Sequence, residues 1–117
     1  MDKIFFITML YDFYSELLTN KQKEIFELYY LNDLSLYEIS SEYKITRQAV
    51  LDSIKRTEKS LLYYEEKLSL IEKYLNQKKI INKLIKNIED TISNNHLNKD
   101  NIYLLYNIQK SLNSLLD

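Results

Sequence analysis

The spacing of apolar residues predicts an all-α protein with one long helix near its middle. From residue 46 to about residue 75, the inward positions alternate by four and three residues, which is the 3.5-residue period of a helical seam. These positions are Val50, Ile54, Thr57, Leu61, Tyr64, Leu68, Ile71 and Leu75. No residue in this segment breaks a helix, so we expect a single helix of about 45 Å that needs partner helices along its length.

Two capping boxes mark where shorter helices begin before this seam. Thr19 is followed three residues later by Gln22, and Ser35 is followed in the same way by Glu38. In such a pair the hydroxyl oxygen accepts from the third helical N–H, and the Gln or Glu side chain accepts from the N–H of the capping residue. We therefore expect one helix to start just after Thr19 and another just after Ser35.

Apolar residues at helical spacing predict further helices over about residues 3–18, 76–94 and 100–116, the last two forming a C-terminal helical hairpin. We expect a helix-turn-helix head over residues 1–60. Over residues 46–117 we expect the long helix and the C-terminal helices to form a dimerisation bundle within one continuous domain, because the seam is more apolar than one head can bury. The seam residues expected at the homodimer interface are Leu61, Tyr64, Leu68, Ile71 and Leu75.

Residues 35–56 predict a helix-turn-helix, whose second helix would enter a nucleic-acid groove. The first helix would end at a tight turn through Lys44 and Ile45, and Thr46 would cap the second helix. Because Lys44 stands where such turns often have Gly, its backbone would take a positive φ at a cost of about 1 kcal/mol. Arg, Lys and Gln on the second helix supply donors for phosphates and base edges. The candidate nucleic-acid contacts are Arg47, Gln48, Lys55, Arg56 and Lys59.

The composition argues against most classes of enzyme. The chain has no Gly, Pro or Cys, so it lacks the Gly-rich phosphate loops, the nucleophile elbow and any thiolate ligand or nucleophile. Its one histidine, His96, lies in a polar turn and has no second His or Cys with which to form a metal site. We expect no enzymatic activity, no catalytic residue, no metal and no cofactor.

The charge distribution favours the second helix of the motif as the nucleic-acid surface, although the formal net charge of the whole chain is only −1. Residues 1–46 carry four lysines against eight acids. Residues 47–75 carry six basic residues against five acids, and residues 76–117 carry six lysines against four acids. Positive charge therefore begins where the candidate recognition helix begins, and a merely solvated helix face would give the same pattern.

The hydropathy pattern gives no sign of export or membrane insertion. No apolar run approaches the roughly 18 residues that a membrane span needs. The short apolar run at residues 4–10 is followed by Asp12 instead of a small-residue cleavage site. We expect a cytoplasmic protein without a membrane span.

Six blocks, in order, resemble the YlxM family: LYDFY (10–14), LLTNKQ (17–22), YYL (29–31), SLYEI (35–39), RQAV (47–50) and IKRT (54–57). Residues 18–61 are also similar to region four of sigma factors, the helix-turn-helix that reads promoter DNA. The YlxM resemblance implies an all-helical, dimeric, cytoplasmic bacterial protein without enzymatic activity. Members are usually encoded beside the protein subunit and the receptor of the signal recognition particle, which implies an accessory or regulatory role in that pathway.

Three functions are compatible with these patterns. In the first, a homodimer serves the signal recognition particle by binding its RNA, its GTPase subunit or both through the basic face. In the second, the same face reads DNA as a transcriptional regulator, with two half-sites one helical turn apart. In the third, the helix-turn-helix is only a packing unit within a protein-interaction scaffold.

Overall fold

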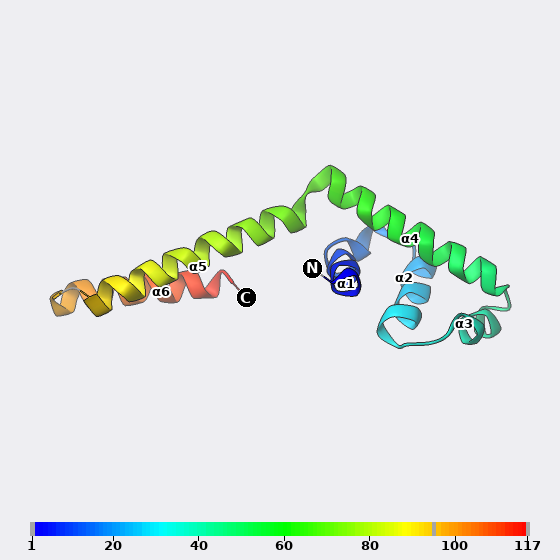
Figure 1. The fold of residues 1–117 in the computed structure, drawn as a ribbon, viewed down its shortest axis with the longest axis horizontal. Coiled ribbons are helices and arrows are strands. Elements are labelled where there is room, and N and C mark those ends of the chain that lie inside the picture. The colour runs from blue at the N-terminus through cyan, green and yellow to red at the C-terminus, as the bar shows by residue number, and fades with distance from the viewer. Residues whose placement is uncertain (1, 95, 117) are drawn as a thin grey trace. The chain divides into compact units, whose positions relative to one another are not determined.

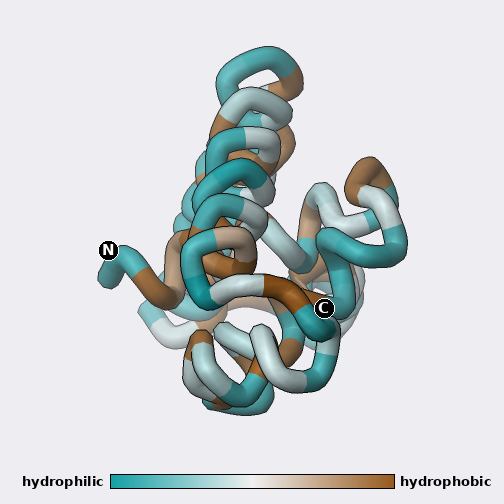
Figure 2. Tube along the Cα trace, turned by 90° about the vertical axis from the view of Figure 1, so that its right-hand side faces the viewer, coloured by the Kyte–Doolittle hydropathy of each residue, from teal (hydrophilic) through white to brown (hydrophobic). Residues whose placement is uncertain are grey.

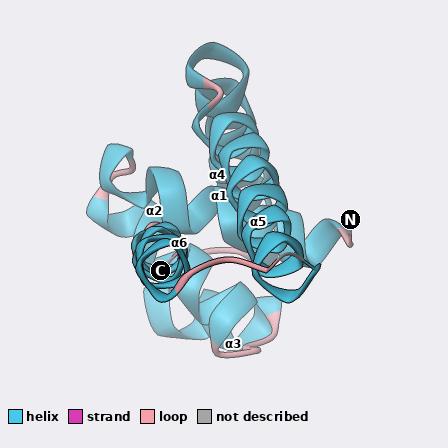
Figure 3. Ribbon diagram, turned by 90° about the vertical axis from the view of Figure 1, so that its left-hand side faces the viewer, coloured by secondary structure: helices cyan, strands magenta, loops and turns pink. Residues whose placement is uncertain are grey.

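The computed structural model of the chain describes residues 2–94 and 96–116. Within these residues every regular element is helical, and Figure 1 and Figure 3 show helices joined by short loops. The all-α prediction is confirmed. Among the described helices, none is both long enough and apolar enough to span a membrane.

The chain divides into two compact units, Met1–Ile71 (the N-terminal unit) and Glu72–Asp117 (the C-terminal unit). The N-terminal unit contains α1 (Lys3–Tyr14), a 3-10 turn (η1, Ser15–Leu17), α2 (Asn20–Phe26), a π-helical turn (η2, Glu27–Leu31), α3 (Leu36–Tyr43) and α4 (Arg47–Leu68). Helix α5 (Leu70–Asn94) starts at the end of the N-terminal unit and continues through the C-terminal unit. There α6 (Lys99–Ser114) runs back along α5.

The starts of α2 and α3 are capped as the sequence predicts. Thr19 Oγ1 accepts from the Gln22 N–H at 3.2 Å, and the Thr19 N–H donates to Gln22 Oε1 at 2.9 Å. Ser35 and Glu38 form the same reciprocal pair at 3.1 and 3.0 Å. The bonds from Ser35, chiefly from its backbone N–H, lower the pKa of the Glu38 carboxyl because they favour its charged form. Both predicted capping boxes are confirmed.

Helix α4 is the central helix of the N-terminal unit, because α1, α2 and α3 all pack against it. A buried cluster of Ile25, Ile39, Val50 and Ile54 joins α2, α3 and α4, and none of these side chains is more than 2% exposed. Figure 2 shows apolar and polar residues alternating along the helices, as amphipathic packing requires. The apolar side of α4 is thus occupied by the chain itself, which leaves its polar side for other contacts.

The prediction of one unbroken helix over residues 46–75 is wrong. Helix α4 ends at Leu68, and Ser69 adopts a left-handed conformation with φ 54°. The Ser69 N–H donates to the backbone oxygen of Glu65 at 2.8 Å, which closes the last turn of α4. The apolar spacing continues across this break, so the spacing alone contains no sign of it.

A contact from α1 fixes the start of α5. The Leu70 N–H donates to Tyr14 Oη at 3.1 Å, and the Ile71 N–H donates to the Glu65 carboxylate at 3.0 Å. Tyr14 in turn donates to that carboxylate at 2.5 Å. These acceptors satisfy N–H groups that a helix start leaves without intrahelical partners. Tyr14 and Glu65 therefore stabilise the break where the sequence predicts continuity.

Other helix boundaries differ less from the predicted ones. The first helix ends at Tyr14 and continues as the 3-10 turn η1, whereas the apolar spacing predicts a helix that reaches residue 18. The second helix becomes the π-helical turn η2 after Phe26. The helix predicted from residue 76 begins at Leu70, and α6 is one residue earlier at its start than predicted. Ends of this kind depend on local hydrogen bonds that periodicity does not reveal.

Four Tyr–Glu hydrogen bonds connect the elements of the N-terminal unit. The pairs are Tyr11–Glu27 (2.6 Å), Tyr14–Glu65 (2.5 Å), Tyr43–Glu24 (2.7 Å) and Tyr30–Glu58. The bond to Glu24, with partial burial, raises the pKa of Tyr43 to about 12. Burial, followed by the bond to the partner carboxylate, raises the pKa of Tyr11 and of Tyr30. The hydroxyls therefore stay protonated and keep donating across the neutral pH range.

Candidate nucleic-acid interface

The helix-turn-helix consists of α3, a three-residue turn and α4. Lys44 in the turn has φ 55°, which confirms the predicted positive φ at this non-Gly position. The Ile45 N–H donates to the backbone oxygen of Ser40 at 3.1 Å, and Thr46 Oγ1 accepts from the Ala49 N–H at 3.0 Å. Because these bonds satisfy the end of α3 and the start of α4, they fix the turn between the two helices.

Arg47 lies in the first turn of α4, on the flank that faces α3. Its guanidinium carbon is 4.8 Å from the centre of the Tyr37 ring, which is a cation–π contact. Both side chains are exposed to solvent. Tyr37 thus orients the Arg47 side chain without burying its N–H donors, which can still bind an anionic group.

A polar stripe runs along the side of α4 that faces away from buried Val50. It consists of Gln48, Asp52, Lys55 and Lys59, at steps of four, three and four residues, and all four are exposed. Gln48 Nε2 donates to Asp52 Oδ1 at 2.8 Å. The Gln48 amide must therefore release this carboxylate before it can contact a base edge.

Arg56 lies on the flank of α4 opposite Arg47. Nine residues separate the two, and at about 3.6 residues per turn this is two and a half turns. The five predicted contacts therefore cover about half of the circumference of α4. The structure brings Gln48, Lys55 and Lys59 together on the outer stripe and places the two arginines on either side of it.

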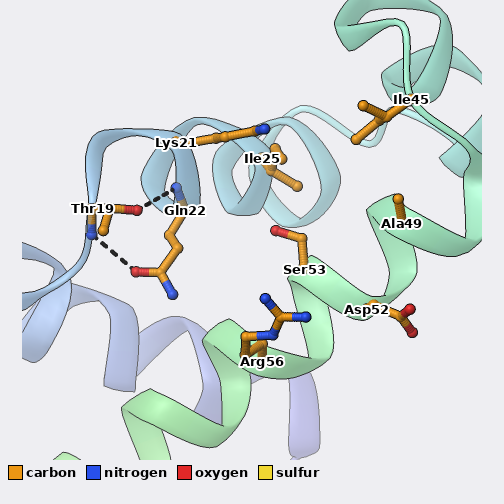
Figure 4. A pocket seen from close by; sticks show the side chains of 9 residues that line it. All are labelled: Thr19, Lys21, Gln22, Ile25, Ile45, Ala49, Asp52, Ser53 and Arg56. Atoms are coloured by element: carbon orange, nitrogen blue, oxygen red, sulfur yellow. Dashed lines mark hydrogen bonds between the residues drawn. The ribbon is translucent and has the colours of Figure 1, made fainter.

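Arg56 also lines a cavity of about 480 Å³ between α2 and α4, shown in Figure 4. Its lining residues are Thr19, Lys21, Gln22, Ile25, Ile45, Ala49, Asp52, Ser53 and Arg56. Lys21 comes from α2 and Arg56 from α4, so each of these two helices contributes a cation to the lining, and Asp52 is among the other lining residues.

A second, more open cavity of about 350 Å³ continues along the same flank of α4. Arg56 and Lys59 line it together with Ser60, Tyr63 and Tyr64. Lys21 and Tyr63 are not among the site residues predicted from the sequence. The capping box at Thr19 could have identified Lys21, because it places this residue at the exposed start of a helix.

The residues predicted for a dimer interface lie in different environments within the single chain. Leu61 is 0% exposed and Ile71 is 2% exposed, so the chain itself already buries both side chains. Tyr64 and Leu75 are half-buried. Leu68, at 44% exposed, is the one of the five that offers a freely exposed apolar side chain.

The chain matches the model of one protein family over residues 1–111, and the family is described as "UPF0122: Putative helix-turn-helix protein, YlxM / p13 like". It is 57% identical to a UPF0122 protein of Caldanaerobacter subterraneus subsp. tengcongensis over 83 residues, which cover 71% of each chain. It is 52% identical to UPF0122 protein YlxM of Bacillus subtilis over 84 residues, which cover 72% of this chain and 76% of the relative. A UPF0122 protein of Listeria welshimeri is 51% identical over 78 residues, 67% of this chain and 71% of its own.

Proposed function

This chain belongs to the UPF0122 family of YlxM/p13-like helix-turn-helix proteins, and on that basis we propose that it binds nucleic acid through α3 and α4 and catalyses no reaction. The observation that supports this most is the placement of cations on α4. A recognition helix in a groove has a phosphate strand on each side and base edges in front of it. Arg47 and Arg56 would bind the two strands, and the stripe between them would face the bases.

The nucleic acid in this proposal is the RNA of the signal recognition particle, with its GTPase subunit as a protein partner and the cytoplasm as the place of action. The support is the set of sequence blocks that resemble the YlxM family. Regular A-form RNA has a deep, narrow major groove that side chains cannot read. Helix α4 would therefore bind where a loop or bulge opens the groove.

The alternative is a dimeric regulator that reads DNA, and one observation favours it specifically. The major groove of B-DNA is about 12 Å wide and admits an α-helix. The polar side chains of α4 cover about half of its circumference, with an arginine on each flank. A helix of this kind would fit into that groove without distortion of the nucleic acid. The similarity of residues 18–61 to region four of sigma factors supports the same alternative.

Sequencing of the nucleic acid that crosslinks to the protein in bacterial cells tests this function. We expect the RNA of the signal recognition particle to be enriched over total RNA, and the enrichment to fall when Arg47 and Arg56 are both replaced by Ala. Enrichment of palindromic DNA would favour the regulator instead. Recovery of neither nucleic acid above the background of an unrelated tagged protein would refute nucleic-acid binding.

We propose that the protein is a homodimer whose interface includes the C-terminal unit. Large aliphatic side chains that remain 42–60% exposed there are Ile80 and Leu84 on α5, Leu104 and Ile108 on α6, and Leu115 just after α6. Four of these residues each come directly before a more buried residue of the same helix: Ile80, Leu84, Leu104 and Ile108. Because one residue corresponds to a rotation of about 100° around a helix, all four side chains are turned in the same direction away from the contact between α5 and α6. In an antiparallel helix pair, this places them on one face.

A second copy is the occupant that suits this face, because a two-fold axis brings the same apolar side chains opposite each other. The four side chains on this face form a patch of roughly 350–400 Å², a little under half of the area that one partner contributes to a standard interface. Leu68 is a further exposed apolar side chain. Pairing two helical hairpins by their apolar faces would give a four-helix bundle.

Charge introduced into this face should separate the subunits. We expect L84K/I108K to sediment as a folded monomer, because lysines facing each other across the two-fold axis repel and lose hydration. The matched control Y103K/Y106K adds the same charge at exposed α6 positions and should remain a dimer. Sedimentation velocity reports the mass, and far-UV circular dichroism the helix content. A folded dimer for L84K/I108K would eliminate this interface.

A further inference from the structure

Positive charge is most concentrated on α5, outside the helix-turn-helix. Residues 73–88 contain five lysines and neither Asp nor Glu. These lysines are Lys73, Lys78, Lys79, Lys83 and Lys86, and all are exposed. The polar side of α4, by contrast, alternates its cations with acids such as Asp52 and Glu66. Net positive potential is therefore higher along α5 than along the predicted recognition helix.

Lys79, Lys83 and Lys86 form a stripe, at steps of four and three residues along one side of α5. Buried Ile81 and Ile85 lie on the other side of the helix, facing α6. At a rise of 1.5 Å per residue the three lysines span about 10 Å of the helix axis. The lysine stripe (Lys79, Lys83 and Lys86) thus presents three cations in a row to solvent.

Two other lysines of the C-terminal unit lie near aromatic rings. Lys78 Nζ lies 5.8 Å from the centre of the Tyr74 ring, and Lys110 Nζ lies 5.7 Å from that of Tyr106. No such ring contact occurs for the lysine stripe in the described part of the chain. The stripe is therefore a row of three exposed lysines without a ring contact among the described residues.

The first two lysines of the stripe, Lys79 and Lys83, are arranged in a way that opposes helix stability. Like charges three or four residues apart on a helix repel, whereas alternating Glu and Lys at these spacings would attract. Lys79 and Lys83 have no acid three or four residues away on either side. Lys86 differs, because Glu89 and Asp90 follow it by three and four residues. Proteins usually keep charge arrangements that destabilise a helix only where the charges have a function. The repulsion between Lys79 and Lys83 therefore indicates that they bind an anionic partner.

We infer that the lysine stripe is a second nucleic-acid contact, which binds the phosphate backbone of a duplex. A duplex strand carries one charge about every 3.4 Å along its axis, so a row of about 10 Å matches some three phosphates. Such contacts add affinity and position the duplex, whereas base edges at α4 would supply sequence preference. This inference rests on the proposed nucleic-acid binding and extends it to the C-terminal unit.

The test compares K79Q/K83Q/K86Q with the control K73Q/K99Q/K110Q, which removes the same charge from exposed positions of the same unit. Fluorescence anisotropy measures the affinity for labelled duplex RNA and duplex DNA of one sequence over a range of KCl concentrations. We expect the stripe variant to bind at least tenfold more weakly at low salt. We also expect its log–log salt slope to be smaller by about 2 to 3, because each lost phosphate contact removes about 0.9. The control should stay within about twofold of the wild type.

Three results would overturn the inference: no loss in the stripe variant, an equal loss in both variants, or stripe-dependent binding to phosphatidylserine vesicles without any to either duplex. A parallel R47A/R56A variant separates the two claims. If it loses binding while the stripe variant does not, only the second contact is refuted. If the wild type binds neither duplex, the second contact is refuted, and sequencing of crosslinked nucleic acid from cells then decides the proposed nucleic-acid function separately. Circular dichroism confirms that each variant is folded.

Discussion

Replacing Leu61 by Ala should lower the free energy of unfolding by roughly 2–5 kcal/mol, the usual range for a fully buried leucine. Leu61 is 0% exposed within the single chain, so its truncation leaves a cavity beside α4. The adjacent Leu62 is 46% exposed, and L62A should change the stability by no more than about 0.5 kcal/mol. Urea denaturation followed by far-UV circular dichroism measures both.

The same experiment distinguishes the two roles considered for Leu61. If the chain itself buries this side chain, the loss in L61A should be the same at low and high protein concentration. If Leu61 formed a seam between subunits, the loss would depend on concentration, because dissociation is linked to unfolding. Equal effects of L61A and L62A would contradict the packing described for α4.

Features determined by neighbouring residues could be predicted from the sequence. The capping boxes at Thr19 and Ser35 need only residues three positions apart, and the positive φ of Lys44 follows from its place in the turn, where Gly is common. The all-α class follows from apolar spacing summed over the whole chain. In each case the interacting groups lie within a few residues of each other, so the pattern contains the information.

Features determined by distant residues could not be predicted. The end of α4 depends on Tyr14, more than fifty residues away, which binds Glu65 and the N–H of Leu70. The heptad spacing correctly indicates that Leu61 and Ile71 have packing partners. It cannot tell whether another chain or the same chain supplies them, and in this protein the same chain buries both.

The positions of the candidate contact residues around α4 could be predicted from the sequence, but the shape of the surface around them could not. Arg47 and Arg56 can be placed on opposite flanks of α4 from their separation alone, once the helix is known to continue between them. The cavity that Arg56 shares with Lys21 depends on how α2 packs against α4. Sequence spacing does not contain that packing.

Replacing both arginines, as R47A/R56A, should weaken nucleic-acid binding by more than tenfold. Each arginine faces a different phosphate strand in the proposed complex, and a charge-assisted hydrogen bond typically contributes about 1.5–3 kcal/mol. Both side chains are exposed, so the helix content should not change. The matched control K3A/K67A removes two positive charges from exposed positions of the same unit and should lose little affinity.

The most direct test of the helix-turn-helix as the binding surface is the salt dependence of nucleic-acid binding for these three proteins. Anisotropy titrations from low to moderate KCl give the slope of log K against log salt concentration. We expect the slope of R47A/R56A to be smaller than that of the wild type by about 2, because two phosphate contacts are lost, and that of K3A/K67A to be unchanged. If wild type and R47A/R56A show the same affinity and the same slope, α4 is only a packing helix and does not form the nucleic-acid interface.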